Sequence, residues 1–302
     1  MSVFRSDDFI KALASSALPM HKGALVADGC LHRYQVEGDK SGSKNGWYVL
    51  HLDDKPFGAF GSWKTGQSET WTPASAQTMT EAERKALTVR MAEAKKARDS
   101  EQAAVQASAR KRALNLWEKS KPAFNDHAYL VRKFVPAYGL RLLREQLVIP
   151  LRDIEGVLHR LQFIGGDGRK TFLTGGRKRG CYHAIGRPEA ALCICEGYAT
   201  GATIYQATGI ATAVAFDAGN LQPVAKALRQ KFPHLVLVIA ADNDTETPGN
   251  PGLRAAQAAA QAVRCPGRAN VCGGGQCLIN PTSTIWLEWP VARPWWRLFR
   301  QP

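Results

Sequence analysis

The sequence has no long apolar run and no paired cysteine spacing, and each absence excludes a class of protein. No stretch approaches the ~20 consecutive apolar residues of a membrane-spanning helix, and the opening MSVFRSDDFIKALASS carries acids where a secretion signal has a long apolar segment. We therefore expect a soluble, cytoplasmic protein that does not enter a membrane. The seven cysteines form no CxxC pairs, so we expect reduced thiols, no disulfide framework and no zinc.

The remaining composition is that of an ordinary folded protein with an excess of positive charge. Of the 302 residues, 45% are hydrophobic and 22% are charged, which excludes a disordered, collagen-like or coiled-coil chain and allows about two domains. The 40 Lys and Arg against 26 Asp and Glu give a net charge of +14. This balance favours a polyanionic partner, nucleic acid first, although a basic surface without a partner has the same composition.

Changes in composition divide the chain into four segments. Residues 1–75 alternate apolar and polar residues between Gly, Ser and Asn clusters, and predict a small strand-rich module. Residues 76–145 predict a helical, basic linker, because much of this segment is rich in Ala, Glu, Lys and Arg. Residues 146–263 alternate apolar strands with helices and predict a parallel sheet. Residues 264–302 form an atypical tail that loses this patterning.

The aromatic side chains of the first segment have two interpretations. Aromatic residues on a small sheet can stack on nucleic-acid bases, but they more often form the core of the sheet. We favour the core for this set, which comprises Tyr34, Trp47, Tyr48, Phe57, Phe60, Trp63 and Trp71. The basic face of the helical linker is likewise interpreted as solvated, with contacts to a nucleic-acid backbone as the alternative.

Acidic residues follow two of the buried strands expected in residues 146–263. Glu196 comes directly after ALCIC, and Asp242 and Asp244 follow LVLVIAA. Because the ligand site of a parallel sheet lies at the carboxyl ends of its strands, these carboxylates can converge on a hard divalent cation such as Mg²⁺. The aspartates could instead cap the following turn. Glu196 has a weaker alternative, because an acid after this apolar run is costly to bury unless it is paired or bound to metal.

A strongly basic segment precedes Glu196. Between Arg160 and Arg187 the sequence has seven Lys and Arg and a single acid. Glycines in this segment let backbone amides and cations approach phosphates, so we expect nucleotide or template binding by Lys170, Arg177, Lys178 and Arg179. An exposed loop made basic for solubility explains the segment equally well when it is taken alone.

The residues around these acids also resemble a known family. LCICEGYATGATIYQATG, followed by VAFDAGNLQPVAKALRQKFPHLVLVIAADND, resembles the toprim domain of plasmid and phage primases. In that domain a Glu-Gly follows one strand and an Asp-x-Asp follows a later one, as Glu196-Gly197 and Asp242-Asn243-Asp244 do here. Upstream, IPLRDIEGVLHRLQFIGGDGRKTFLTGG resembles the segment that precedes toprim in bacterial-type primases. Residues 1–75 resemble the amino-terminal region of such plasmid proteins less specifically.

The resemblance implies an α/β fold with a toprim, Rossmann-like parallel sheet, and a DNA primase that makes short RNA primers on single-stranded DNA from ribonucleoside triphosphates. It implies two Mg²⁺ or Mn²⁺ ions, with Glu196 as a metal ligand or general base and Asp242 and Asp244 as metal ligands. Lys170 and residues 177–179 would hold phosphates. Asp217, in FDAGN, is a fourth candidate for the metal, although it is also a good helix N-cap, which we favour.

Two other functions are compatible with the same acids. Toprim metal sites also serve strand cleavage, so a toprim nuclease is one alternative and a non-catalytic accessory protein that binds single-stranded DNA is another. The basic segment before Glu196 favours the primase. A purely structural DNA-binding module would bind without regard to Mg²⁺ or to Glu196.

The sequence departs from replicative primases in three ways. It has no amino-terminal zinc ribbon, and it has no GxxxxGK[ST] motif, so unwinding would need a separate helicase. Residues 264–302 hold four of the eight Trp and three of the seven Cys but no Lys or Asp. We hypothesise a frameshifted or recombined gene end for this tail, and a genuine partner-binding tail is the alternative.

Overall fold

A computed structural model describes the protein at residues 6–20, 23–39, 41–52, 56–73, 80–242, 250–263 and 285–289. The chain forms two compact units, residues 1–103 and residues 104–302. Helix α2 (Glu81–Lys119) contributes residues to both units, and it confirms the long helix expected from the Ala-, Glu- and Lys-rich sequence. Among the described helices, α2 included, none is apolar over a length that could cross a membrane.

The first unit is built on a four-stranded antiparallel meander. Its strands are β1 (His32–Tyr34), β2 (Gly46–His51), β3 (Phe57–Ser62) and β4 (Ser68–Trp71), paired in that order. Helix α1 (Ser6–Ser15), which the sequence analysis did not predict, covers one face of this sheet with Phe9 and Leu13, which share a buried cluster with Tyr48 and Phe60. The strand-rich amino-terminal module is therefore confirmed, and most of its aromatic side chains form its core.

The second unit begins with an antiparallel sheet. Its strands are β5 (Lys121–Pro122), β6 (Arg141–Leu143), β7 (Gln146–Arg152), β8 (Leu158–Ile164) and β9 (Lys170–Phe172), in that spatial order. The short helix α3 (Ala128–Lys133) lies between β5 and β6. The end of α2 packs on this sheet through Ala113 and Trp117, which share a cluster with Val148 and Leu161.

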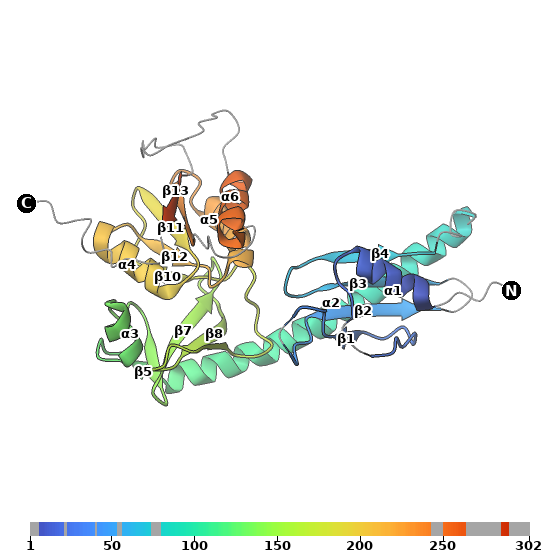
Figure 1. Ribbon diagram of the computed structural model, residues 1–302, viewed down its shortest axis with the longest axis horizontal. Coiled ribbons are helices and arrows are strands. Elements are labelled where there is room, and N and C mark those ends of the chain that lie inside the picture. Colours follow the sequence, from blue (N-terminus) through green and yellow to red (C-terminus); the bar gives the residue numbers. More distant parts are fainter. Residues whose placement is uncertain are drawn as a thin grey trace, which may run out of the picture. The chain divides into compact units, whose positions relative to one another are not determined.

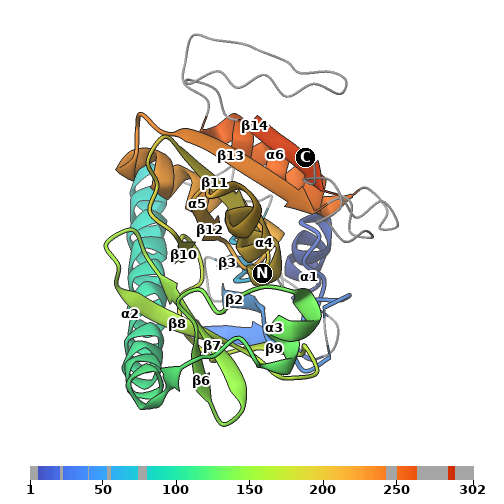
Figure 2. The same cartoon turned by 90° about the vertical axis from the view of Figure 1, so that its left-hand side faces the viewer.

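The rest of the second unit is a mostly parallel sheet with helices on both faces. Its order is β10 (His183–Ile185), β12 (Thr212–Val214), β11 (Ala191–Cys195), β13 (Val236–Asp242) and β14 (Ile285–Trp289), and only β10 runs antiparallel to its neighbour. Figure 2 shows these strands side by side. Helices α5 (Ala218–Lys231) and α6 (Pro251–Ala262) pack on one face, and α4 (Tyr198–Thr208) packs on the other (Figure 1). The α/β fold with a parallel sheet is confirmed.

One part of the 264–302 tail forms a strand that the sequence did not predict. Strand β14 pairs in parallel with β13, with Trp289 opposite Asp242, so the sheet has a strand beyond β13. The sequence IWLEW combines β-branched and aromatic residues, which suit a strand, although the Pro-, Gly- and Cys-rich surroundings obscure it. The other residues of the 264–302 tail lie outside the described part of the chain, and the frameshift stays a hypothesis about the gene.

Candidate functional site

The candidate site lies at the carboxyl edge of the parallel sheet. Glu196 directly follows β11, and Asp242 is the last residue of β13. These two strands are adjacent and parallel, with Ile194 opposite Ile239, so the backbones at Glu196 and Asp242 leave the sheet at the same edge, from neighbouring strands. The side chain of Asp242 and the whole of Asp244 lie outside the described residues.

The backbone of Glu196 is held on both sides. The amide of Phe216 donates to the Glu196 carbonyl at 2.8 Å, which joins the end of β12 to the end of β11. Gly197 begins α4 in an extended conformation. Tyr198, which is fully buried, donates its hydroxyl proton to the Pro136 carbonyl at 2.6 Å and accepts from the Tyr138 amide at 2.7 Å. These contacts fix the position from which the half-buried Glu196 side chain leaves the sheet.

A glycine lets α4 approach the sheet closely at this edge. A Cβ atom on Gly201 would lie 2.9 Å from Cγ2 of Val214 and 3.0 Å from the Cys195 sulfur. These separations are shorter than ordinary van der Waals contact, so a larger residue would push the first turns of α4 away from β11 and β12. The second glycine of EGYATG therefore has a packing reason to be there.

Asp217 is placed as a helix cap. Its side chain accepts from the Asn220 amide at 3.1 Å as the N-cap of α5, and its other oxygen forms an ion pair with Lys178. The residue before it, Phe216, has a φ of +76°, a conformation that bulky residues rarely adopt. The N-cap interpretation is confirmed, and Lys178, one of the expected phosphate ligands, is brought to this end of the sheet.

Asn220 fastens the basic segment to the sheet, a role that sequence reasoning missed. Its side chain is 2% exposed and uses three hydrogen-bonding positions. Oδ1 accepts from the Gly180 amide at 2.8 Å, and Nδ2 donates to the carbonyls of Cys181 and Ala215 at 2.9 and 2.8 Å. The only sequence signal was an Asn in the first turn after a predicted N-cap, where polar residues are common for other reasons.

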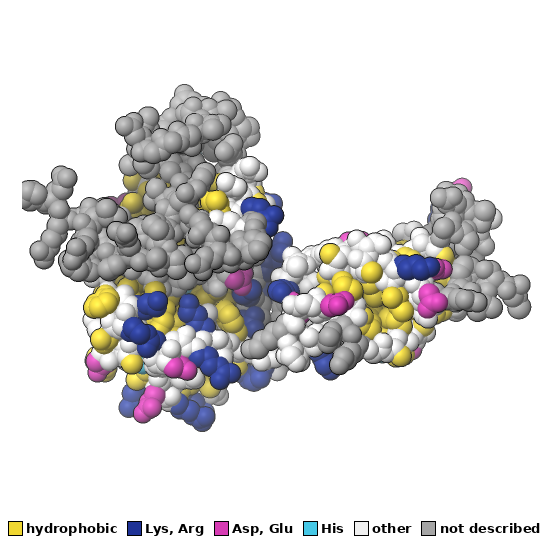
Figure 3. Space-filling model, viewed as in Figure 1, with side chains coloured by type: hydrophobic (Ala, Val, Ile, Leu, Met, Phe, Trp, Pro, Cys, Tyr) yellow, Lys and Arg dark blue, Asp and Glu magenta, His cyan; other side chains and the backbone are white. Residues whose placement is uncertain are grey.

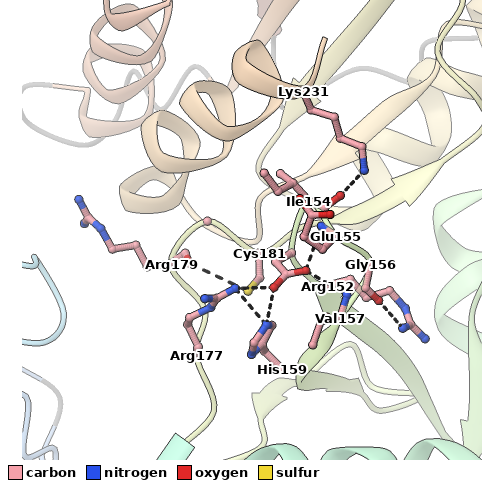
Figure 4. Close-up of polar contacts among 12 residues, drawn as sticks. Arg152, Ile154, Glu155, Gly156, Val157, His159, Arg177, Arg179, Cys181 and Lys231 are labelled. Atoms are coloured by element: carbon pink, nitrogen blue, oxygen red, sulfur yellow. Dashed lines mark hydrogen bonds and ion pairs between the residues drawn. The ribbon is translucent and has the colours of Figure 1, made fainter. Parts of the chain in front are cut away.

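The expected phosphate ligands occupy different environments. Arg177 donates to Oδ2 of Asp153 at 2.9 Å and lies 3.0 Å from Nε2 of His159, which is itself 2.7 Å from the same carboxylate oxygen (Figure 4). Burial raises the pKa of Asp153, but hydrogen bonds from His159 and Val157 outweigh it and hold that pKa below its usual value. Arg177 is therefore held by the protein itself.

Two of the other expected ligands, Lys170 and Arg179, face outward. Lys170 is the first residue of β9 and is exposed, and Arg179 is exposed and points away from the Asp153 cluster (Figure 4). Arg160, which the sequence analysis did not single out as a ligand, stacks its guanidinium over Phe172 at 4.9 Å and donates to the Leu173 carbonyl at 2.8 Å. Burial lowers the pKa of Arg160, and the nearby charge of Asp217 opposes that shift.

The chemistry of this edge suits a hard cation. Cys193 and Cys195 of β11 are buried in the core, and burial raises the pKa of the Cys193 thiol to about 12. These two soft sulfur ligands therefore do not face the edge of the sheet. Glu196, which follows β11 at this edge, offers a carboxylate, and Mg²⁺ and Mn²⁺ prefer oxygen ligands. Within the described residues no three His, Cys, Asp or Glu side chains group together, and the side chains of Asp242 and Asp244 lie outside those residues.

Comparisons with known proteins agree with these motifs. Residues 190–271 match the Toprim domain family. The chain is 37% identical over 276 residues to a DNA primase TraC of Escherichia coli, a match that covers 87% of this chain and 26% of that protein. A second DNA primase TraC of E. coli is 38% identical over 273 residues, covering 85% and 19%. The chain thus spans about a quarter or less of the length of these curated relatives.

Solved primase structures are also similar to part of this chain. The primase fragment of the bacteriophage T7 primase-helicase protein is 13% identical, with a TM-score of 0.37, and the match covers 49% of this chain and 67% of that one. The Toprim family match includes both the Glu196-Gly197 and the Asp242-Asn243-Asp244 motifs. The matches to the two TraC relatives extend over most of this chain. The chain therefore carries a toprim domain, and its resemblance to toprim-domain DNA primases is confirmed.

Proposed function

We propose that this chain is a DNA primase that synthesises short RNA primers on single-stranded DNA by divalent-metal-dependent nucleotidyl transfer, in plasmid or phage replication. The observation that carries the proposal is the placement of Glu196 and Asp242 at the ends of adjacent parallel strands. A basic segment is fastened to the same end of the sheet by Asn220. In this proposal the acids bind the metal and the cations bind the phosphates, and nucleotidyl transfer requires both groups close together.

The acidic residues would hold the metal. Glu196, Asp242 and Asp244 would bind Mg²⁺ or Mn²⁺, which when bound supplies positive charge to the triphosphate and to the attacking 3′-hydroxyl. The contacts of the Glu196 and Gly197 backbone with Phe216 and with α4 fix where the Glu196 carboxylate enters the site. Glu196 can also accept the proton of the hydroxyl, because it leaves the sheet at the reacting edge.

The basic residues would hold the phosphates. Lys178 forms an ion pair with Asp217, and because this pair is about a third exposed, a triphosphate can compete for Lys178 at little cost. Arg179 and Lys170 are exposed, and in this proposal they contact the phosphates of the template or the nucleotide. Arg177 keeps its bonds to Asp153 and positions the segment instead of contacting phosphate.

The proposed partners follow from this chemistry. They are single-stranded DNA as template, ribonucleoside triphosphates as substrates, and a separate helicase that supplies the single strand. The net charge of +14 suits the two polyanions.

The test is primer synthesis on single-stranded DNA with labelled ribonucleotides and Mg²⁺. We compare the native chain with Glu196→Gln and with Glu189→Gln, a control at an exposed glutamate that precedes the same strand. Short RNA products that disappear in Glu196→Gln and persist in Glu189→Gln support the primase. Metal-dependent degradation of the template without synthesis would instead identify a toprim nuclease, and binding without either reaction would identify an accessory protein.

A further inference from the structure

The segment between β5 and β6 exposes large apolar side chains. Phe134 is 81% exposed, Phe124 is 73% exposed and Val131 is 56% exposed. These are the most exposed large apolar side chains in the described part of the second unit, and the two phenylalanines are the only exposed aromatics there. Burial of a phenylalanine side chain stabilises a fold, and Phe124 and Phe134 are too exposed to contribute much of that stability.

The backbone conformation of Phe134 is also unfavourable for a bulky residue. It ends α3 with a φ of +55°, in the left-handed conformation, and its amide donates to the carbonyls of Leu130 and Val131. Glycine is the usual residue at such a helix end, because a Cβ atom is disfavoured there. The chain therefore holds a bulky aromatic residue where the backbone favours glycine and where its ring gains no burial.

These residues share one corner of the second unit. The amide of Ala123 donates to the Leu140 carbonyl at 3.1 Å, and the amide of Ala137 donates to Oδ1 of Asn125 at 2.9 Å. Phe124 thus lies between two residues bonded to the segment that follows Phe134. The Phe134 amide is 3.1 Å from the Val131 carbonyl, which places these two residues on the same end of α3.

The corner is tied to the candidate site. The Pro136 carbonyl, two residues after Phe134, accepts the hydroxyl proton of Tyr198, and the Tyr138 amide donates to the Tyr198 hydroxyl oxygen. Tyr198 is two residues after Glu196 at the start of α4. The segment that carries the exposed rings is therefore hydrogen-bonded to the start of α4, next to Glu196 in the chain.

The charge around the rings is mainly positive. Arg132 and Lys133 lie in the same segment and Lys121 lies in β5 just before it, against one acid, Asp126. Figure 3 shows hydrophobic side chains beside Lys and Arg side chains over α3. Aromatic rings interleaved with cations suit single-stranded nucleic acid, because bases stack on rings while phosphates pair with cations. An apolar protein partner would gain nothing from these cations.

We propose that Phe124 and Phe134, with Val131 beside them and Arg132 and Lys133 around them, form a stacking surface that binds single-stranded DNA next to the toprim edge. This inference deepens the proposed function, since it assigns the template a place on the chain. The aromatic rings stack on unpaired bases, and the cations contact the phosphates.

The test is the binding of a fluorescent oligothymidine of about 20 nucleotides to the full chain, measured by anisotropy without nucleotides or divalent metal. Phe124→Leu and Phe134→Leu remove the rings and keep an apolar side chain, and each is expected to raise the Kd about fivefold or more. Phe134→Tyr is expected to bind like the native chain. Val105→Ala, at an exposed apolar residue of α2, serves as the control and should change the Kd by less than about twofold.

A second variant separates binding from folding. Phe134→Gly removes the ring and places the favoured residue at the left-handed position, so the melting temperature should rise by roughly 2–4 °C while oligothymidine binding weakens as in Phe134→Leu. Native binding in both leucine variants would overturn the proposal. A protein-docking role would give that same result, because leucine preserves an apolar contact.

The two proposals fail in different ways. Glu189→Gln, at the exposed glutamate that precedes β11, should bind oligothymidine like the native chain, and the binding assay needs no metal. If the native chain makes no primers but ring-dependent binding holds, the primase proposal fails and the stacking surface stands. If primers are made but the leucine variants bind normally, the stacking surface is wrong.

Discussion

At the scale of single residues, Asn220 makes the most specific contacts near the site. Replacement of Asn220 by alanine leaves the Gly180 amide and the Cys181 and Ala215 carbonyls without their buried partner. We expect the free energy of unfolding to fall by roughly 2–4 kcal/mol, measured by urea denaturation. Gln230→Ala, at an exposed residue near the other end of α5, is the control and should change it little. If Asn220→Ala lowered the free energy of unfolding as little as Gln230→Ala does, the three hydrogen bonds of Asn220 would not hold the basic segment.

Asp217 offers a residue-scale test of cap against metal ligand. Asp217→Ala removes the N-cap acceptor of α5 and should cost about 1 kcal/mol of stability. Asp217→Asn keeps that acceptor and should stay within about 0.5 kcal/mol of the native chain. The ion pair with Lys178 is partly exposed and adds little. Thermal denaturation measures both changes. Loss of metal-dependent primer synthesis in Asp217→Asn would contradict the cap assignment and favour a fourth metal ligand.

At the scale of elements, β10 contains a buried histidine that makes stability depend on pH. Burial lowers the pKa of His183 to about 4 in the folded chain, against 6.5 for a free histidine. Between these values the unfolded chain binds a proton that the folded chain does not, so stability falls as the pH decreases through this window. From pH 7.5 to pH 5 the loss from this group should be about 2 kcal/mol.

The histidine variants isolate this contribution. His183→Gln keeps a donor for the Tyr138 carbonyl, to which His183 Nε2 donates at 2.9 Å, and should remove the pH-dependent loss from urea denaturation at pH 7.5 and pH 5. His234→Gln, at an exposed residue, should leave the loss as it is. A native-like loss in His183→Gln would show that another group causes it.

The elements differ in how far the sequence predicted them. The apolar runs and helical repeats around Glu196 predicted β11, β12 and β13 and the helices between them, because each is a local pattern with a clear turn on either side. The antiparallel β10, strand β14 and helix α1 were not predicted. HAI and IWLEW are too short to show a period, and α1 gains its stability from packing against the first sheet.

The same division holds for the site. The strand ends carrying Glu196 and Asp242 were predicted, since the edge of a parallel sheet follows from the order of strands and helices. The sequence did not predict that Asn220 contacts residues 180 and 181, or that Arg177 contacts Asp153. These contacts join segments 24 to 40 residues apart in the chain, and no local pattern records which side chains meet across that separation.

At the scale of the whole molecule, the net charge of +14 predicts that binding of single-stranded DNA weakens as the salt concentration rises. If the exposed cations contact phosphates, the logarithm of the single-stranded DNA association constant should fall linearly with the logarithm of salt concentration. A slope of about −3 or steeper corresponds to four or more phosphate contacts. Fluorescence anisotropy of the full chain between low and physiological salt measures this slope. A slope near zero would show that the positive charge serves another purpose.

The central claim is that the acids at the ends of β11 and β13 form one metal site. Its most direct test is Mn²⁺ binding to the full chain, followed by electron paramagnetic resonance, in Glu196→Gln, Asp242→Asn and the double variant, with Glu189→Gln as control. If both acids bind one ion, each single change should weaken binding by about tenfold or more, and the double variant should be weaker by less than the product of the two effects. Native Mn²⁺ affinity in both single variants would contradict the claim.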